Sequence, residues 1–181
     1  MNIDLLKYPI GDFSAPSSYN VGSLSEWIHT ISEFPEQVKN AVKGLTIKEL
    51  NWEYRPGGWS IKQVIHHCGD SHMNSIIRFK LALTEKLPSI KPYHENLWAE
   101  LADGIDDNIS YSIQLLEGLH YRWTKLLKSL TEEQLTRQFI HPEHGKKFTL
   151  WETIANYAWH CQHHLAHIKQ AIQYQGKFDL S

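Results

Sequence analysis

Histidine is concentrated in two short windows of the sequence, and it is the residue type here best suited to chemistry. Seven of the 12 histidines lie in residues 66–72 and 160–167. Imidazole binds transition metals and transfers protons near neutral pH. His160 and His164 are four residues apart, which on a helix stacks their rings one turn apart, about 6 Å between Cβ atoms. The spacing predicts that both side chains reach one metal ion.

A third ligand is expected from the first window, where His67 lies on a polar stripe beside an apolar stripe that would face the core. The same polar stripe carries Asp70, Ser71, Asn74 and Arg78. Three imidazoles with an open further position are a ligand set of catalytic zinc. We therefore predict one divalent metal ion per subunit, held by His67, His160 and His164. Zinc is the expected metal and nickel the alternative.

The polar residues beside the expected ligands are candidates for the remaining roles. Asp70 and His163 could orient a ligand or transfer a proton. Arg78, Asn74 and Asn156 could bind a substrate, with Arg78 suited to an anionic group. The alternative is that these stripes face water and that Asp70 only pairs with Arg78.

Two other metal arrangements compete with the three-histidine site. Cys68 and Cys161 each follow an expected ligand, but they point about 100° away from it toward the apolar side, which favours buried thiols. The motif Glu-x-x-His at residues 26–29 and 117–120 matches an element of di-iron carboxylate proteins. In a meander bundle its supporting glutamates would lie in different layers, so the histidine site is favoured.

Four long amphipathic segments must position these residues. Apolar periodicity and capping pairs predict helices over residues 23–45 (bent or split by Pro35), 60–86, 109–130 and 149–175. Residues 1–21 are expected to be an extended lead-in, and residues 139–148 a turn-rich loop with exposed histidines at 141 and 144. No alternating strand pattern is present. The sequence thus predicts an all-α four-helix bundle whose long connections, 87–108 and 131–148, permit a non-meander order.

Length and charge exclude several classes of protein. The chain of 181 residues is expected to form a single domain, residues 1–181, whose hydrophobic core is large enough to be stable without covalent cross-links. A net charge of −2 provides no electrostatic footprint for nucleic acid and no polybasic membrane patch. No apolar run reaches the length of about 18 residues needed to span a membrane. Two cysteines make no disulfide framework, and we expect the cytoplasm.

Three segments resemble the DinB superfamily and, more closely, its YfiT-like branch of metal-dependent hydrolases. They are residues 54–60 (Tyr-Arg-Pro-Gly-Gly-Trp-Ser), 64–75 and 159–168, and the resemblance extends over nearly the whole chain. It implies a four-helix bundle of non-meander order and a homodimer. It also implies one divalent metal held by His67, the second histidine of the His-His-x-x-Asp segment, and by His160 and His164. Cys68 stands where similar sequences carry leucine, which supports a packing role.

The resemblance leaves three functions open. As a hydrolase, the protein would use the metal to activate water against an acyl or related electrophile of a small molecule. Some DinB-type relatives are thiol S-transferases that use bacillithiol or mycothiol, and there the open position would bind a low-molecular-weight thiol. A structural or metal-sensing site is the third reading, which a fourth ligand such as His163 or His167 would favour.

Overall fold

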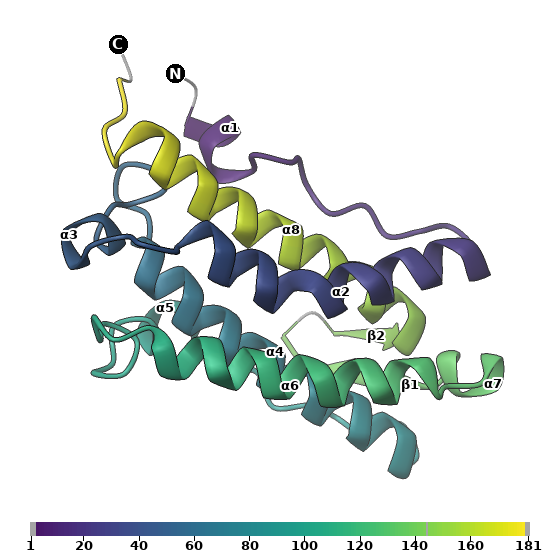
Figure 1. Ribbon diagram of the computed structural model, residues 1–181. Helices are drawn as coiled ribbons and strands as arrows, with labels where there is room; N and C mark the ends of the chain where they lie inside the picture. The colour runs from purple at the N-terminus through teal and green to yellow at the C-terminus, as the bar shows by residue number, and fades with distance from the viewer. Residues whose placement is uncertain (1–2, 144, 180–181) are drawn as a thin grey trace.

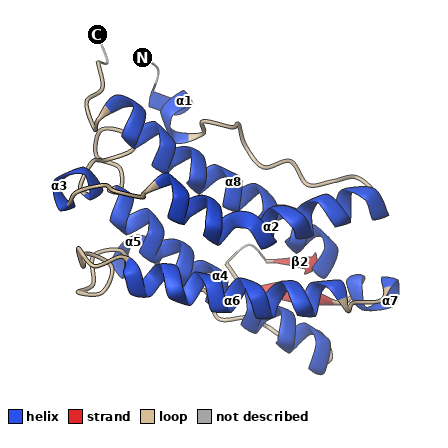
Figure 2. Cartoon of the chain, viewed as in Figure 1, coloured by secondary structure: helices blue, strands red, loops and turns tan. Residues whose placement is uncertain are grey.

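The computed structural model, which describes residues 3–143 and 145–179, is built on four long helices (Figures 1 and 2). They are α2 (Val21–Ala41), α4 (Ile61–Thr84), α6 (Ser110–Lys128) and α8 (Leu150–Tyr174). Each corresponds to one of the segments predicted from the apolar periodicity. The four-helix bundle is therefore confirmed.

Reciprocal caps fix the first turns of the two helices that carry the histidine windows. At the start of α4, Ser60 accepts a hydrogen bond from the backbone N–H of Gln63, and the Gln63 side chain accepts one from the backbone of Ser60. Thr149 and Glu152 form the same pair at the start of α8. Such caps satisfy two backbone donors that the helix leaves unpaired. The histidines downstream are thus carried on helices whose starting points are well defined.

The helices are connected in a non-meander order. α2 packs against α6 and α8, and α4 packs against the same two helices, so α2 and α4 lie on a diagonal of the bundle. Figure 1 shows α2 and α8 running in one direction and α4 and α6 in the other. The connection between α4 and α6 therefore travels the length of the bundle. The connection between α6 and α8, which was also expected to be able to do so, stays at one end.

Three local features differ from the sequence prediction. The lead-in contains a short helix, α1 (Ile3–Lys7), because Leu6 finds a buried position. α2 is not split at Pro35 and continues to Ala41. Residues of the expected loop form a hairpin of β1 (Gln138–His141) and β2 (Lys146–Thr149). Short helices α3 (Ile47–Leu50), α5 (Glu95–Trp98) and α7 (Glu132–Leu135) complete the described chain.

The hairpin forms because its apolar residues pair across the two strands and along a third segment. Phe139 lies opposite Phe148, and their ring centroids are 5.9 Å apart. Ile140 exchanges backbone hydrogen bonds with the segment after α4, accepting from Ile90 and donating to Pro88. The hairpin thereby closes one end of the bundle beside α4. His144, expected in this region, lies outside the described residues.

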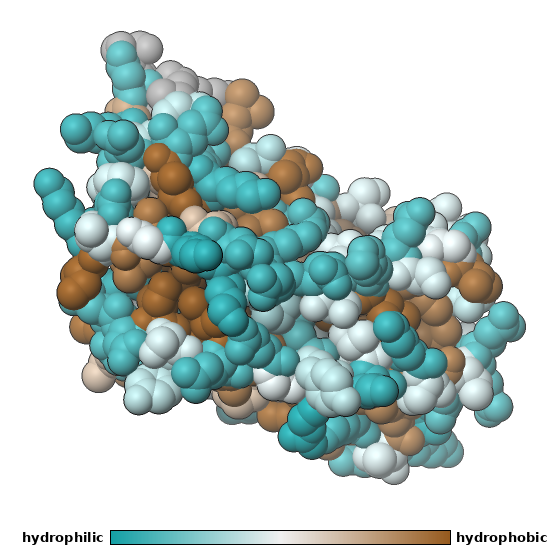
Figure 3. Space-filling view, viewed as in Figure 1, coloured by the Kyte–Doolittle hydropathy of each residue, from teal (hydrophilic) through white to brown (hydrophobic). Residues whose placement is uncertain are grey.

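The core lies where the apolar stripes of the four helices meet. Fully buried side chains include Ile31, Phe79, Trp123, Leu127, Ile154 and Ile168. Polar side chains cover much of the face seen in Figure 3, with apolar groups scattered between them. In the part of the chain that the structure describes, no helix combines the length and apolarity that crossing a membrane would require.

Candidate metal centre

Three histidines from α4 and α8 converge as the sequence predicts. His67, His160 and His164 each offer a ring nitrogen, and these nitrogens lie within 4.8 Å of one another. The ring centroid of His160 is 4.3 Å from that of His164 and 5.5 Å from that of His67, and the His67 and His164 centroids are 4.9 Å apart. α4 and α8 pack directly against each other, so the convergence follows from the helix packing.

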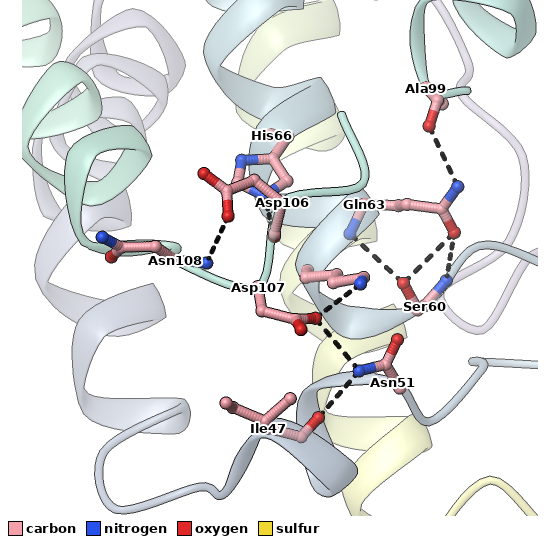
Figure 4. Close-up of polar contacts among 10 residues, drawn as sticks. Ile47, Asn51, Ser60, Gln63, His66, Ala99, Asp106, Asp107 and Asn108 are labelled. Atoms are coloured by element: carbon pink, nitrogen blue, oxygen red, sulfur yellow. Dashed lines mark hydrogen bonds and ion pairs between the residues drawn. The ribbon is translucent and has the colours of Figure 1, made fainter. Parts of the chain in front are cut away.

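A polar network holds the first turns of α4, from which His67 projects. Gln63 donates from its side-chain nitrogen to the carbonyl of Ala99, and Lys62 pairs with Asp107 at 2.6 Å (Figure 4). His66, next to the expected ligand, bonds Ser112 Oγ through Nδ1 and the carbonyl of Asp106 through Nε2. These contacts tie α4 to the first turn of α6 and to the segment that precedes it. His66 thus points away from the site, toward α6 and the segment before it.

Burial keeps the three converging rings in the form that binds metal. Desolvation, together with the neighbouring His163, lowers the pKa of His67 to about 4. Desolvation and the surrounding histidines hold the pKa of His160 and that of His164 well below the ordinary value. Neutral imidazole keeps a lone pair, which is the donor that zinc and similar divalent metals bind. The donor set therefore fits a divalent transition metal.

The three rings line a cavity of about 510 Å³, here called the histidine cavity. Its other lining residues come from α1, the loop before α4, α5 and α8, and include Tyr8, Tyr54, Arg55, Trp59, Glu95, Trp159, His163 and His167. Trp59 packs on His67 with the ring centroids 4.5 Å apart. The three predicted ligand residues therefore line a space that could admit a small molecule.

A second cavity of about 560 Å³ adjoins the first and is here called the Arg78 cavity. His160, Glu95 and Asn96 line both cavities, which therefore meet at these three residues and are here called the two arms of the candidate site. The predicted substrate-binding residues Arg78 and Asn156 line the second arm, together with Ser71, Tyr93, His141 and Tyr157. Desolvation raises the pKa of the Glu95 carboxyl and that of the Tyr93 hydroxyl. The candidate site thus combines a wall of three converging histidines with a cationic group and a carboxyl.

The structure does not bring Asp70 or Asn74 to these cavities, contrary to the roles predicted for them. The electrostatic neighbours of the Asp70 carboxyl are Asp103 and His66, and desolvation raises its pKa. Asn74 donates to the backbone carbonyl of Asp70, within its own helix. Both residues share the broad polar stripe with His67, but it is Ser71 on that stripe that contacts α8, with its hydroxyl 3.4 Å from Tyr157 Oη and 3.5 Å from His160 Nε2. The catalytic role predicted for Asp70 and the substrate-binding role predicted for Asn74 are therefore wrong, because both residues lie outside the two cavities.

His163 lies at the histidine cavity, as expected of a residue beside the ligands. Its ring stacks on Trp159 with centroids 4.4 Å apart, and its buried Nδ1 atom has no hydrogen-bond partner among the described residues. Together with His164 and His167 it forms a second group of converging nitrogens. A neutral imidazole has one lone pair, so His164 can serve one of the two groups at a time.

The competing arrangements lack the required geometry. Glu117 bonds Lys39 at 2.7 Å on the surface, and the His29 side chain is 76% exposed, so the Glu-x-x-His motifs do not converge in the interior. Cys68 and Cys161 are free and completely buried. Burial raises the pKa of both thiols, which removes the thiolate that a metal would need. The packing role predicted for the cysteines accords with these positions.

Comparison with known proteins identifies the family. The sequence model of the DinB superfamily, a protein family, matches residues 30–168 of the chain. The chain belongs to the DinB superfamily. YfiT of Bacillus subtilis, provisionally named a metal-dependent hydrolase, is 44% identical over 171 residues, covering 94% of this chain and 96% of YfiT. A relative from Oceanobacillus iheyensis, provisionally named in the same way, is 48% identical over 162 residues, 90% of this chain and 93% of the relative.

A solved structure of Bacillus subtilis YfiT extends the comparison to the fold of this DinB-superfamily member. It superimposes with a TM-score of 0.92 at 44% identity, and the match covers 96% of this chain and 99% of YfiT. That protein is described as a probable metal-dependent hydrolase with an unusual four-helix bundle topology. The non-meander order found here agrees with that description.

Sequence reasoning missed three residues that the structure places at or behind the site. Glu95 lies on α5, a helix too short to leave a periodic signal, and it lines both cavities. His72 and His120 are buried in the bundle and bond each other. A signal for these two existed, because each histidine lies on the otherwise apolar stripe of its helix. Such a position predicts a polar partner elsewhere in the core.

Proposed function

We propose that the protein is a metal-dependent hydrolase of a small-molecule substrate, with His67, His160 and His164 as ligands of one divalent metal. The observation that carries the proposal is that these three neutral imidazoles converge on the wall of a cavity that shares three lining residues with the second arm. A divalent metal in such a site supplies a Lewis acid and activates water for attack on an electrophilic carbon. The names given to the relatives support the same reaction class.

The chain's own residues suggest how a substrate would be held. Arg78, whose Nε atom is buried and has no hydrogen-bond partner among the described residues, can donate to an anionic or carbonyl oxygen in the second arm. Asn156 lines the same arm and can donate to a second oxygen. Glu95 stands between the arms and, with its raised pKa, is placed to exchange a proton with the reacting group. His163 is the alternative proton carrier.

The finer parts of the proposal concern the metal, the assembly and the compartment. Zinc suits a set of three imidazoles, with nickel as the alternative. Two free, buried thiols are compatible with a reducing compartment, the cytoplasm. We also propose a homodimer, for which exposed apolar side chains on α6, including Tyr111, Leu115 and Tyr121, provide a candidate contact surface.

Metal analysis combined with hydrolysis assays tests the proposal. We expect about one equivalent of bound metal, and turnover of small ester or amide substrates that is lost on chelation and restored by zinc. The variant His67→Ala should lose both metal and turnover. His66→Gln, on the same helix but bonded away from the site, is the matched control and should keep both. Turnover that survives complete metal removal would contradict the proposal.

The same preparation separates the hydrolase from a thiol S-transferase. Each substrate is assayed with and without a small thiol such as cysteine, and the products are identified by mass spectrometry. A hydrolase gives the product of water addition in both cases. Formation of a thioether or thioester only in the presence of thiol would assign the S-transferase reaction instead.

A further inference from the structure

A path of hydrogen bonds leads from the ligand His160 across the whole bundle. His160 Nδ1 lies 3.0 Å from His72 Nε2, and His72 Nδ1 lies 2.8 Å from His120 Nε2. His120 Nδ1 in turn lies 2.6 Å from the carbonyl oxygen of Ile31. The four residues belong to α8, α4, α6 and α2. Because His72 and His120 are 0% and 1% exposed, their ring nitrogens must find partners inside the protein.

Pro35 explains why the path ends at Ile31. In a regular helix the carbonyl of residue 31 would accept a hydrogen bond from the N–H of residue 35, but proline has no N–H. α2 continues through Pro35, so the Ile31 carbonyl is left without its usual helical donor. His120 supplies the missing donor. The proline that the sequence suggests as a helix breaker instead opens an acceptor in the core.

The carbonyl at one end sets the direction of every hydrogen bond in the path. A carbonyl oxygen only accepts, so the hydrogen lies on His120 Nδ1 and the lone pair on His120 Nε2. His72 must then donate from Nδ1 and accept at Nε2, and His160 must donate from Nδ1. Each neutral ring has a single N–H. The lone pair of His160 is therefore on Nε2, which lies 3.5 Å from the Ser71 hydroxyl and outside the path. This is the nitrogen available to a metal.

The second ligand on α8 is supported in the same way by a shorter path. His164 Nδ1 lies 3.4 Å from His167 Nδ1, and His167 Nε2 lies 3.0 Å from the carbonyl oxygen of Lys7. Lys7 is the last residue of α1, where helical carbonyls lack an intrahelical donor. His167 also stacks on Tyr54, with ring centroids 3.7 Å apart, which fixes its plane. The hydrogen on His167 Nε2 leaves Nδ1 to accept from His164.

We propose that His72, His120 and His167 are positioning residues that hold His160 and His164 in the Nδ1–H tautomer and so direct Nε2 of both rings to the metal. Ligating histidines commonly donate their second nitrogen to a fixed acceptor, which sets tautomer and ring orientation. Here that acceptor is another histidine, anchored in each path by a carbonyl outside regular helical pairing. This inference rests on the metal site proposed above. It also assigns His167 to the support of His164 rather than to a second metal site with His163 and His164.

Nitrogen-15 NMR of the metal-free wild-type protein tests the tautomers directly. We expect His160, His164, His72 and His120 to carry their hydrogen on Nδ1, and His167 to carry it on Nε2. An Nε2–H tautomer at His160 or at His164 would overturn the proposal. Because no metal is present in this experiment, its result does not depend on whether the proposed hydrolase activity exists.

Zinc affinity, measured by competition with a chromophoric chelator, tests the energetic consequence. Removing such a partner costs about 10–100-fold in metal affinity, and we expect this loss for His72→Phe, His120→Phe and His167→Phe. The double variant His72→Phe, His120→Phe should lose no more zinc affinity than either single variant, because both substitutions break the same path. In the double variant His72→Phe, His167→Phe the two fold-losses should multiply, because the substitutions break different paths. The matched control is His66→Gln, which removes a buried histidine of α4 that lies outside the paths. Loss of affinity equal to the control's would overturn the proposal.

Pro35→Ala keeps the test informative if the core variants fail to fold. It improves the helix propensity of α2 while supplying an N–H that competes with His120 for the Ile31 carbonyl. We expect a folded protein with weaker zinc binding and a mixed tautomer at His120. Unchanged affinity and tautomer in this variant would overturn the role assigned to the Ile31 carbonyl. Binding of two zinc ions per wild-type chain would overturn the supporting role of His167.

Discussion

Acid should destabilise the metal-free protein steeply, because its buried histidines are neutral in the folded state. Burial lowers the pKa of His67 and of His120 to about 4 and that of His167 to about 3, from an ordinary value of 6.5. Below about pH 6.5 the unfolded chain therefore binds more protons than the folded chain. The stability that these rings contribute is fully present above about pH 6.5 and is lost as the pH falls toward 4.

The size of the effect follows from the proton balance. Between about pH 7.5 and pH 5.5, each ring that stays neutral in the fold but titrates in the unfolded chain costs about 1.3 kcal/mol. His67, His120 and His167 together give a loss of about 4 kcal/mol. The lowered pKa values of His72, His160 and His164 act in the same direction. The loss is a large part of the roughly 5–15 kcal/mol by which a domain is stable.

Urea unfolding of chelator-treated protein at the two pH values measures this loss. The variant His120→Asn should reduce the loss by about 1.3 kcal/mol, because one titrating ring is gone. His29→Gln is the matched control, since the His29 side chain is 76% exposed and changes its surroundings little on unfolding. A free energy of unfolding that differs by less than about 1 kcal/mol between the two pH values would refute the reasoning.

Three further predictions concern the cysteines, the second arm of the site and the assembly. Cys68 and Cys161 should resist a thiol reagent in the native protein and react with it on unfolding; labelling of the native protein would contradict their burial. Cys68→Ala should cost about 1 kcal/mol of stability without weakening zinc binding. Arg78→Gln should raise the KM of anionic substrates by about tenfold and leave the KM of neutral analogues nearly unchanged. An equal rise in KM for both kinds of substrate would argue against anion binding by Arg78. The molar mass measured by light scattering should be that of a dimer for the wild type and that of a monomer for Leu115→Lys. A monomeric wild type would contradict the proposed contact.

The sequence was sufficient to predict the helices that have long periodic patterns. Four helices of about 20 residues each repeat the apolar pattern often enough to be recognised, and an i,i+4 histidine pair defines a face by itself. The hairpin could not be recognised in this way, because each strand has four residues. Alternation over so short a run is not distinguishable from a loop.

The supporting residues required the tertiary arrangement. His72 and His120 are 48 residues apart, and nothing in either helix alone indicates that they meet. Asp70 shows the opposite error, since a helical wheel places it on the ligand stripe but does not show which part of that stripe α8 covers. Periodicity predicts that a stripe faces another helix, and only the packing of the helices selects the residues that meet.

The central claim is that His67, His160 and His164 hold a divalent metal, and anomalous diffraction from zinc-loaded crystals tests it most directly. We predict one anomalous peak per chain, at bonding distance from Nε2 of His160 and of His164 and from a ring nitrogen of His67, with at least one position left to water or substrate. A peak among His163, His164 and His167 instead, or a metal closed by a fourth protein ligand, would contradict the account.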